Sequence, residues 1–318
     1  MSLSTEPVAQ AAAPAPPVDR TMEAVVAELR ELRNASLAAR RRSSNPLKLP
    51  SRKSLNAIVE GLSTVLFPNR LGSRQLAHES IDYYVGHTLD DSCRDLVEQV
   101  ALELQFVGEQ TDPRAGGRKA EELVRDFARG LPQIRRLLEA DILAAYEGDP
   151  AARSIDEVLA CYPGITAIIH YRLAHALHEL GLPLIARMIA EIAHSATGID
   201  IHPGAQIGSS FFIDHGTGVV IGETAVLGER VRLYHGVTLG AKRFTVDESG
   251  VLVKGTARHP IVEDDVVIYA GATILGRVTI GRGSIIGGNV WLTHSIPPGS
   301  QISQAALRVE VFDDGSGI

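Results

Sequence analysis

Aliphatic residues recur every six positions through the C-terminal part of this chain. A period of six fits neither the 3.6-residue helix nor an alternating strand, but it is the period of a parallel β-helix built from hexapeptide repeats. A set of unrelated hairpins would need turn signals every 8–12 residues, and these are absent. We therefore predict a β-helix over residues 199–300, with the following side chains stacked inside it: Ile201, Ile207, Ile213, Ile221, Leu227, Leu233, Leu239, Val262, Ile268, Ile274, Ile280, Ile286 and Leu292.

The repeat is interrupted twice, and both interruptions carry a histidine. The step from Ile213 to Ile221 is eight residues, which inserts two residues beside His215. The step from Leu239 to Val262 is 23 residues, so about 17 residues leave the β-helix as a loop at about 240–259, which ends at His259. A strict register is broken where binding or chemistry needs the backbone aimed outward, so both interruptions are candidate sites.

The residues before the repeat predict an all-α domain. Apolar residues at helical spacing run through 54–198, which we interpret as a helical domain. Residues 1–53 are predicted to be a disordered Pro- and Ala-rich start, a basic helix from Thr21 to about Arg42 and a polar linker. The basic helix face has two interpretations, a solvated surface or a site for an acidic partner. Residues 301–318 form a C-terminal tail, which ends in Ile318.

Composition excludes several classes of protein. The net charge of -7 argues against general nucleic-acid binding. Two cysteines, Cys93 and Cys161, are too few for a disulfide framework and lack the spacing of a zinc site. No apolar run is long enough to span a bilayer, and the N-terminus has no secretory signal. We expect a cytoplasmic protein in which an all-α domain precedes a parallel β-helix.

His215 and His235 are the first candidates for chemistry. They are 20 residues apart, one coil plus the two inserted residues, so we predict that they lie side by side on adjacent coils. One interpretation is acid–base catalysis by His215 beside a carboxylate, either Asp200 or Asp214. The other is a metal site made of His202, His215 and His235. A single histidine in a repeat is more often structural, but clustering near the interruptions favours a site.

Four stretches carry a resemblance to a known family. These are Gly198-Ile-Asp-Ile-His-Pro-Gly, Asp214-His-Gly-Thr-Gly-Val-Val-Ile-Gly-Glu, Val237-Thr-Leu-Gly and Ala257-Arg-His-Pro. Together they resemble the bacterial serine O-acetyltransferases, hexapeptide-repeat enzymes, and the insert from Lys242 to Ala257 is similar to one subgroup of them. The resemblance implies a left-handed β-helix and acetyl transfer from acetyl-CoA to L-serine, which leads to cysteine.

The resemblance also implies roles for individual residues. His215 matches the general base, and Asp200 matches the carboxylate that orients it. The residues that match those holding serine are Asp149, Asp214, Arg258 and His259. The residues that match the oxyanion donor and the CoA path are Ala241, Ala270 and Gly288. Ala241 stands where the family often has Gly, and His235 stands where many members carry Gln, so the role of His235 stays open.

Assembly and regulation follow from the same resemblance. The family forms trimers or hexamers, with the site expected between neighbouring β-helices. The tail ending in Ile318 resembles tails that enter the active site of O-acetylserine sulfhydrylase, although a frayed end is the plain alternative. Cysteine is an expected inhibitor, acetyl-CoA is a co-substrate, and no permanent cofactor or metal is expected. The competing hypotheses are another acetyl acceptor, a γ-type carbonic anhydrase with zinc, or a non-catalytic regulator of the sulfhydrylase.

Overall fold

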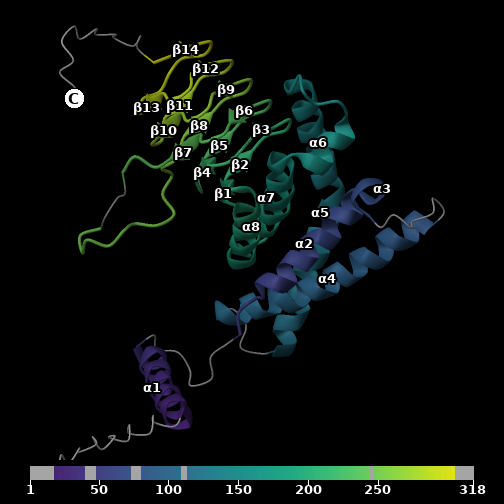
Figure 1. Cartoon of the computed structure of the whole chain (residues 1–318), viewed down its shortest axis with the longest axis vertical. Coiled ribbons are helices and arrows are strands. Elements are labelled where there is room, and N and C mark those ends of the chain that lie inside the picture. The colour runs from purple at the N-terminus through teal and green to yellow at the C-terminus, as the bar shows by residue number, and fades with distance from the viewer. Residues whose placement is uncertain (1–17, 40–47, 73–79, 109–112, 244–246, 305–318) are drawn as a thin grey trace, which may run out of the picture. The chain divides into compact units, whose positions relative to one another are not determined.

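The computed structural model describes residues 18–39, 48–72, 80–108, 113–243 and 247–304. The chain divides into two compact units, residues 1–48 and residues 49–318 (Figure 1). The first unit contains helix α1, Val18–Ala39, which begins slightly earlier than the basic helix predicted from Thr21. The remainder of the predicted disordered start lies outside the described residues.

The helical part of the second unit begins at Arg52, because the Ser51 hydroxyl accepts a hydrogen bond from the Ser54 N–H and caps the first turn. The last helix ends at Thr197 and is capped by Gly198, whose φ of 70° suits glycine. The helices are α2 (Arg52–Leu66), α3 (Pro68–Leu71), α4 (Ile81–Phe106), α5 (Pro113–Gly148), α6 (Ile155–Cys161), α7 (Pro163–Glu179) and α8 (Pro183–Thr197). No helix among the described residues is long and apolar enough to cross a membrane.

The strands after Gly198 form a parallel β-helix with three faces. Consecutive strands lie on successive faces, and almost every strand pairs in parallel with the one three elements later. Sheet A contains β1 (Asp200–Ile201), β4 (Val220–Ile221), β7 (Thr238–Gly240), β10 (Thr273–Leu275) and β13 (Trp291–Leu292). Sheet B contains β2 (Gln206–Ile207), β5 (Val226–Leu227), β8 (Ile261–Val262) and β11 (Thr279–Ile280). Sheet C contains β3 (Phe212–Asp214), β6 (Arg232–Tyr234), β9 (Val267–Ile268), β12 (Ile285–Ile286) and β14 (Gln301–Ile302).

The six-residue series forms the core of this β-helix, as predicted. Each of its aliphatic side chains is buried, with at most 8% of its surface exposed. In sheet A the register places Ile201 on Ile221, Ile221 on Leu239, and Leu239 on Ile274. Stacking like on like removes a continuous apolar column from water, which is the main favourable term for such a fold.

The second interruption leaves the β-helix between β7 and β8, and Figure 1 shows it as a long loop. The coil resumes in register on either side, because β5 pairs with β8 while β7 pairs with β10. The insertion therefore lengthens one corner of one coil and leaves the stack of strands intact.

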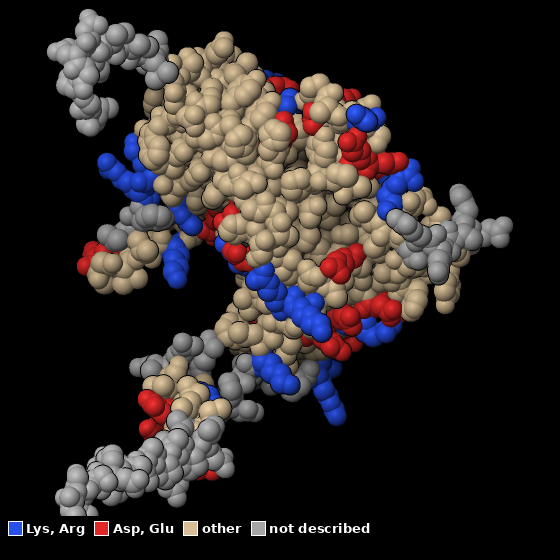
Figure 2. Space-filling view, viewed as in Figure 1, with Lys and Arg blue, Asp and Glu red and all other residues tan. Residues whose placement is uncertain are grey.

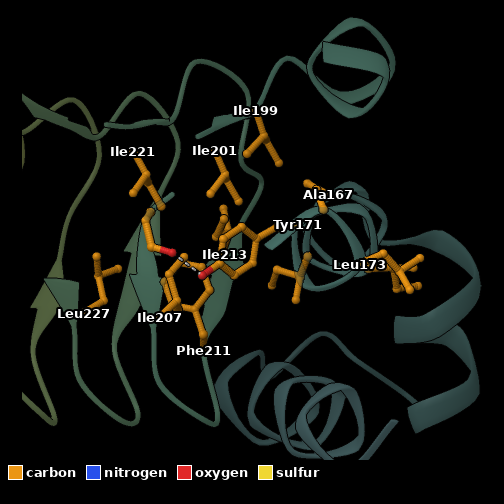
Figure 3. Packing of buried hydrophobic residues seen from close by; sticks show 14 of the residues in the cluster. Ala167, Tyr171, Leu173, Ile199, Ile201, Ile207, Phe211, Ile213, Ile221 and Leu227 are labelled. Atoms are coloured by element: carbon orange, nitrogen blue, oxygen red, sulfur yellow. Dashed lines mark hydrogen bonds between the residues drawn. The ribbon is translucent and has the colours of Figure 1, made fainter. Parts of the chain in front are cut away.

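Helix α7 closes the first end of the β-helix. Figure 3 shows the Tyr171 ring lying among core residues of the first coil, such as Ile199 and Ile213. The Tyr171 hydroxyl donates to the Ala205 carbonyl at 2.7 Å. At the start of α7, a Cβ on Gly164 would lie 2.4 Å from the Ile213 carbonyl, so only glycine permits this approach to β3.

A buried ion pair between α5 and α7 joins the helices to the same coil. Arg172 pairs with Asp141 at 3.0 Å, and both side chains are almost fully buried. Arg172 also donates to the Ile207 and Gly208 carbonyls, and the Asp141 carboxylate accepts from the Phe211 N–H at 2.8 Å. These contacts fix the C-terminal end of α5 against the first coil.

Candidate active site

His215 stands on a corner that repeats along the β-helix. The corner between sheets C and A carries His215, His235, Ala270 and Gly288 on successive coils, and we call it the His215 corner. Backbone hydrogen bonds stack its coils, with Gly236 donating to Thr217, Gly271 to His235 and Asn289 to Ala270. The His215 and His235 ring centroids are 5.8 Å apart, which confirms that the two side chains are neighbours on adjacent coils.

The inserted residues turn His215 outward. His215 has a φ of 59°, a left-handed conformation that non-glycine residues adopt rarely. Gly216 follows with a φ of 84°, and a Cβ there would lie 2.4 Å from Ile199 Cδ1. The tight turn leaves 70% of the His215 side chain exposed, with its Nδ1 atom 3.6 Å from Asp214 Oδ1. An exposed imidazole beside a carboxylate is suited to proton transfer.

Asp214 is buried behind His215 and is shared with a second cation. Its Oδ2 atom accepts from Arg232 Nη2 at 3.3 Å. The Arg232 guanidinium in turn lies 5.0 Å from the centroid of the Phe212 ring and 4.8 Å from that of Tyr234. The aromatic rings and the ion pair hold Arg232 in place, so the Asp214 carboxylate is directed toward His215.

Asp149 follows the end of α5 and reaches the same region. Tyr162 Oη donates to Asp149 Oδ2 at 2.5 Å, and the Ala151 N–H donates to Oδ1 at 2.8 Å. The hydrogen bond from Tyr162 is the largest of the effects that lower the pKa of Asp149, and the charges of Arg232 and His215 add to it. The same hydrogen bond raises the pKa of Tyr162 to about 12. Asp149 is therefore an anion at neutral pH.

Arg258 and His259 lie on a different corner, between sheets A and B, which we call the Arg258 corner. Arg258 Nη2 donates to Glu223 Oε2 at 2.7 Å. The His259 ring lies against Gly222, where a Cβ would be only 2.0 Å from His259 Cδ2. The Thr224 N–H donates to His259 Nδ1 at 3.0 Å, so the neutral ring carries its proton on Nε2. Burial, aided by the charge of Arg258, lowers the pKa of His259 to about 4.

The two corners lie at opposite edges of sheet A. Strand β4 separates His215 from Glu223, and one extended hexapeptide spans roughly 20 Å at about 3.3 Å per residue. The structure thus brings Asp149, Asp214 and His215 together within one chain, and it places Arg258 and His259 together elsewhere.

Asp200 contacts helix α8, and His202 contacts helix α7. The Asp200 carboxylate on β1 is 3.7 Å from Arg187 Nη1 of α8. His202 follows β1 and lies edge-on to His178, with ring centroids 6.2 Å apart. Among the described residues, the group whose potential metal-ligand atoms come together is Glu191, His194 and Asp200, and Arg187 already pairs with Glu191. The three histidines of the metal hypothesis do not converge within one chain.

The base of the long loop is basic. A pocket of about 310 Å³ beside the Arg258 corner is lined in part by Lys242, Arg243, Arg258 and Arg277. Figure 2 shows Lys and Arg side chains gathered where the loop leaves the β-helix. Ala241 precedes this pocket directly after β7 and is half-buried. Such a surface suits an anionic group.

Four residues of the site were not predicted from the sequence: Tyr162, Arg232, Glu223 and Thr224. The six-residue period gave no sign of Arg232, because its side chain acts across strands through Asp214. Tyr162 had one signal, its place directly before Pro163-Gly164, the close approach of α7 to β3.

Comparison with known proteins supports this fold. The family profile described as bacterial transferase hexapeptide (six repeats) matches residues 259–294. The plasmid serine acetyltransferase of Synechococcus elongatus is 61% identical over 275 residues, covering 85% of this chain and 86% of that protein. Serine acetyltransferase 1 of Entamoeba histolytica, solved with L-cysteine, is 37% identical with a TM-score of 0.69, covering 81% of this chain and 88% of its own. The Neisseria gonorrhoeae enzyme, solved with serine, is 28% identical with a TM-score of 0.52, covering 82% and 97%.

Proposed function

Because the chain belongs to the serine acetyltransferase family, whose donor is acetyl-CoA, we propose that His215 is the general base of acetyl transfer to the hydroxyl group of L-serine. The observation that carries this proposal is the exposed His215 imidazole with Asp214 at 3.6 Å behind it. A carboxylate in that position orients the ring and stabilises the imidazolium that forms during the reaction.

One imidazole can carry out both proton transfers of the reaction. His215 takes the proton of the serine hydroxyl as the oxygen attacks the thioester carbonyl carbon, giving a tetrahedral oxyanion. Backbone N–H groups at the start of the loop, near Ala241, stabilise that oxyanion. When the carbon–sulfur bond breaks, the imidazolium returns the proton to the CoA thiolate, which leaves O-acetyl-L-serine and CoA.

Serine needs an anionic and a cationic partner, and the two corners supply them separately. The ionised Asp149 carboxylate binds the ammonium group on the His215 corner. Arg258, together with the Nε2–H of neutral His259, binds the carboxylate from the other corner. Since these corners lie at opposite edges of sheet A, we propose that each site is completed between the His215 corner of one copy and the Arg258 corner of its neighbour in a trimer.

Acetyl-CoA extends along the His215 corner in this proposal. Ala270 and Gly288 follow His235 there on successive coils, and a methyl group at one and no side chain at the other leave the surface open to the pantetheine arm. The basic pocket beside Arg258 offers charge for the CoA phosphates across the same interface.

The experiment is to measure CoA release from acetyl-CoA with and without L-serine, for the parent and for His215→Ala. We expect serine-dependent release that falls at least about a hundredfold in the variant, the usual contribution of a positioned base. His87→Ala is the control, since His87 is exposed on α4 far along the chain from the corner. Absence of release with serine would overturn the reaction, and an unchanged rate in His215→Ala would overturn the base.

The same assay decides which carboxylate orients His215. The family resemblance assigns that role to Asp200, whereas the contact within the chain favours Asp214. Asp200→Asn and Asp214→Asn are therefore compared, and the larger fall in kcat identifies the partner.

Two regulatory proposals remain. L-cysteine differs from L-serine by a thiol in place of the hydroxyl, so Asp149 and Arg258 would hold it equally well, and we propose competitive inhibition. The tail that ends in Ile318 lies outside the described residues, and its binding to O-acetylserine sulfhydrylase stays a prediction.

A further inference from the structure

Helix α1 exposes an apolar stripe for which the proposed reaction has no use. Met22, Val25, Val26, Leu29 and Leu32 have 63%, 46%, 51%, 50% and 60% of their surfaces exposed. Single exposed apolar residues are ordinary, but a contiguous stripe along one helix indicates a contact surface. The opposite face carries residues such as Ala27 and Asn34.

The spacing of this stripe is that of a coiled coil. Four of its residues lie at 22, 25, 29 and 32, which alternate three and four residues and correspond to a and d of a heptad. The next a position is Ser36, where the apolar stripe ends. Val26 occupies the e position directly after Val25 and adds to the apolar surface on one side of this pattern. We call residues 22, 25, 29 and 32 the α1 seam.

The charges beside the α1 seam select its partner. Glu28 occupies a g position and Arg33 the e position of the next heptad. In a parallel coiled coil, g of one helix faces that e position of its neighbour, so Glu28 would meet Arg33. In an antiparallel pair, g faces g and e faces e, so Glu28 could not pair with Arg33. The sequence of one helix is thus complementary to a parallel copy of itself.

We propose that the α1 helices of three copies of this chain associate as a parallel coiled coil. The number three rests on the trimer of the proposed function. It agrees with the α1 seam, where Leu29 at a and Val25 at d depart from the β-branched a and Leu d pattern that favours two strands.

The assembled β-helices make this association possible. A seam this short, of fewer than two full heptads, is marginal for free helices in water. Three copies held in one trimer present their α1 helices to one another at a high effective concentration, on the order of millimolar for a short linker. Only about a dozen residues separate α1 from α2.

The experiment uses the full-length chain with Cys93→Ala and Cys161→Ala, so that introduced cysteines are unique. A short bifunctional maleimide is added to Leu29→Cys, on the α1 seam, and to Ala27→Cys, on the opposite face. We expect at least about tenfold more cross-linked chain for Leu29→Cys, because a positions meet at the axis whereas f positions point outward. Equal cross-linking, or none at either site, would overturn the proposal.

Exchanging the charges of residues 28 and 33 tests whether the α1 helices are parallel. Sedimentation measures whether the chain is a trimer, independently of the α1 contact. In the Leu29→Cys background, Arg33→Glu should slow cross-linking and adding Glu28→Arg should restore it; no restoration would overturn the parallel arrangement. A trimer that fails to cross-link overturns the α1 coiled coil alone. A monomeric chain overturns the trimer of the proposed function and, with it, the three-copy assembly of α1.

Discussion

At the scale of single residues, the site depends on how its charged groups are held. Asp149 receives hydrogen bonds from the Tyr162 hydroxyl and the Ala151 N–H, which leave it ionised and oriented. Asp214 is divided between Arg232 and His215. His259 is neutral because its ring is buried and its Nδ1 accepts a hydrogen bond. Each of these side chains is therefore held in place by hydrogen bonds or an ion pair with a neighbouring residue.

Replacing Tyr162 by phenylalanine should weaken serine binding. A hydrogen bond to a charged group contributes about 1.5–3 kcal/mol, so we expect the KM for serine to rise about tenfold or more while kcat changes less. Removing this bond also raises the pKa of Asp149, so the rise in KM on acidification should begin at a higher pH. Serine kinetics from neutral to acidic pH provide the measurement. Tyr146→Phe on α5 is the control, and an unchanged KM in Tyr162→Phe would refute the role.

His259 should make stability fall in mild acid. Its folded pKa of about 4 is below its ordinary value of 6.5, so the unfolded chain binds a proton that the folded chain refuses. Its contribution is complete above pH 6.5 and is lost as the pH falls toward 4. His259→Asn retains an acceptor at the Nδ1 position without this titration, so its Tm should fall less than the parent's between about pH 7 and about pH 5. Equal losses of Tm would contradict this assignment.

Some of these residues were predictable and others were not. The period of six, with two inserted residues, sufficed to place His215 beside His235. The sequence left Asp200 and Asp214 open as partners of His215, and only the turn geometry distinguished their contacts. Tyr162 and Arg232 carry no periodic signal, because their partners come from elements that meet only after α5 and α7 pack against β3.

At the scale of elements, repetition made the β-helix predictable. Every coil repeats the same inward aliphatic positions, so a single pattern predicts all three sheets. Helix bounds were less predictable, because they depend on local caps: α2 begins at Arg52 since Ser51 caps it, inside the linker predicted to end at residue 53. The joint between helices and β-helix depends on Arg172 and Asp141, which no pattern singled out.

Removing the Arg172–Asp141 ion pair should lower the free energy of unfolding much more than removing an exposed ion pair. Burial raises the pKa of Asp141 to about 6, so at neutral pH it is mainly an anion that needs Arg172. Arg172→Met leaves it unpaired, and we expect the free energy of unfolding to fall by about 3–5 kcal/mol. Arg94→Met removes exposed, solvent-screened pairs on α4 and should leave the free energy of unfolding almost unchanged. Urea unfolding compares the two variants. Equally small losses in the free energy of unfolding would show that the Arg172–Asp141 pair contributes little to stability.

At the scale of the whole molecule, the proposed function gives each chain two half-sites. The stacking that brings His215 and His235 together also keeps His215 and Arg258 on different corners, separated by the width of sheet A. The six-residue period predicts how coils stack within one chain, but it does not predict how copies of the chain contact one another. The family resemblance supplied the expectation of a site shared between copies. The separation of the His215 corner from the Arg258 corner within one chain supports that expectation.

Mixed assemblies test the shared site directly. His215→Ala and Arg258→Ala should each be nearly inactive alone, since every site lacks either its base or its carboxylate anchor. In trimers co-expressed at equal amounts, half of the copies supply an intact His215 and half of their neighbours supply an intact Arg258. About one quarter of the interfaces then carry both, so activity should return to roughly a quarter of the parent's. If His215 and Arg258 acted within the same chain, no copy in the mixture would contain both, and activity would stay at the level of the single variants.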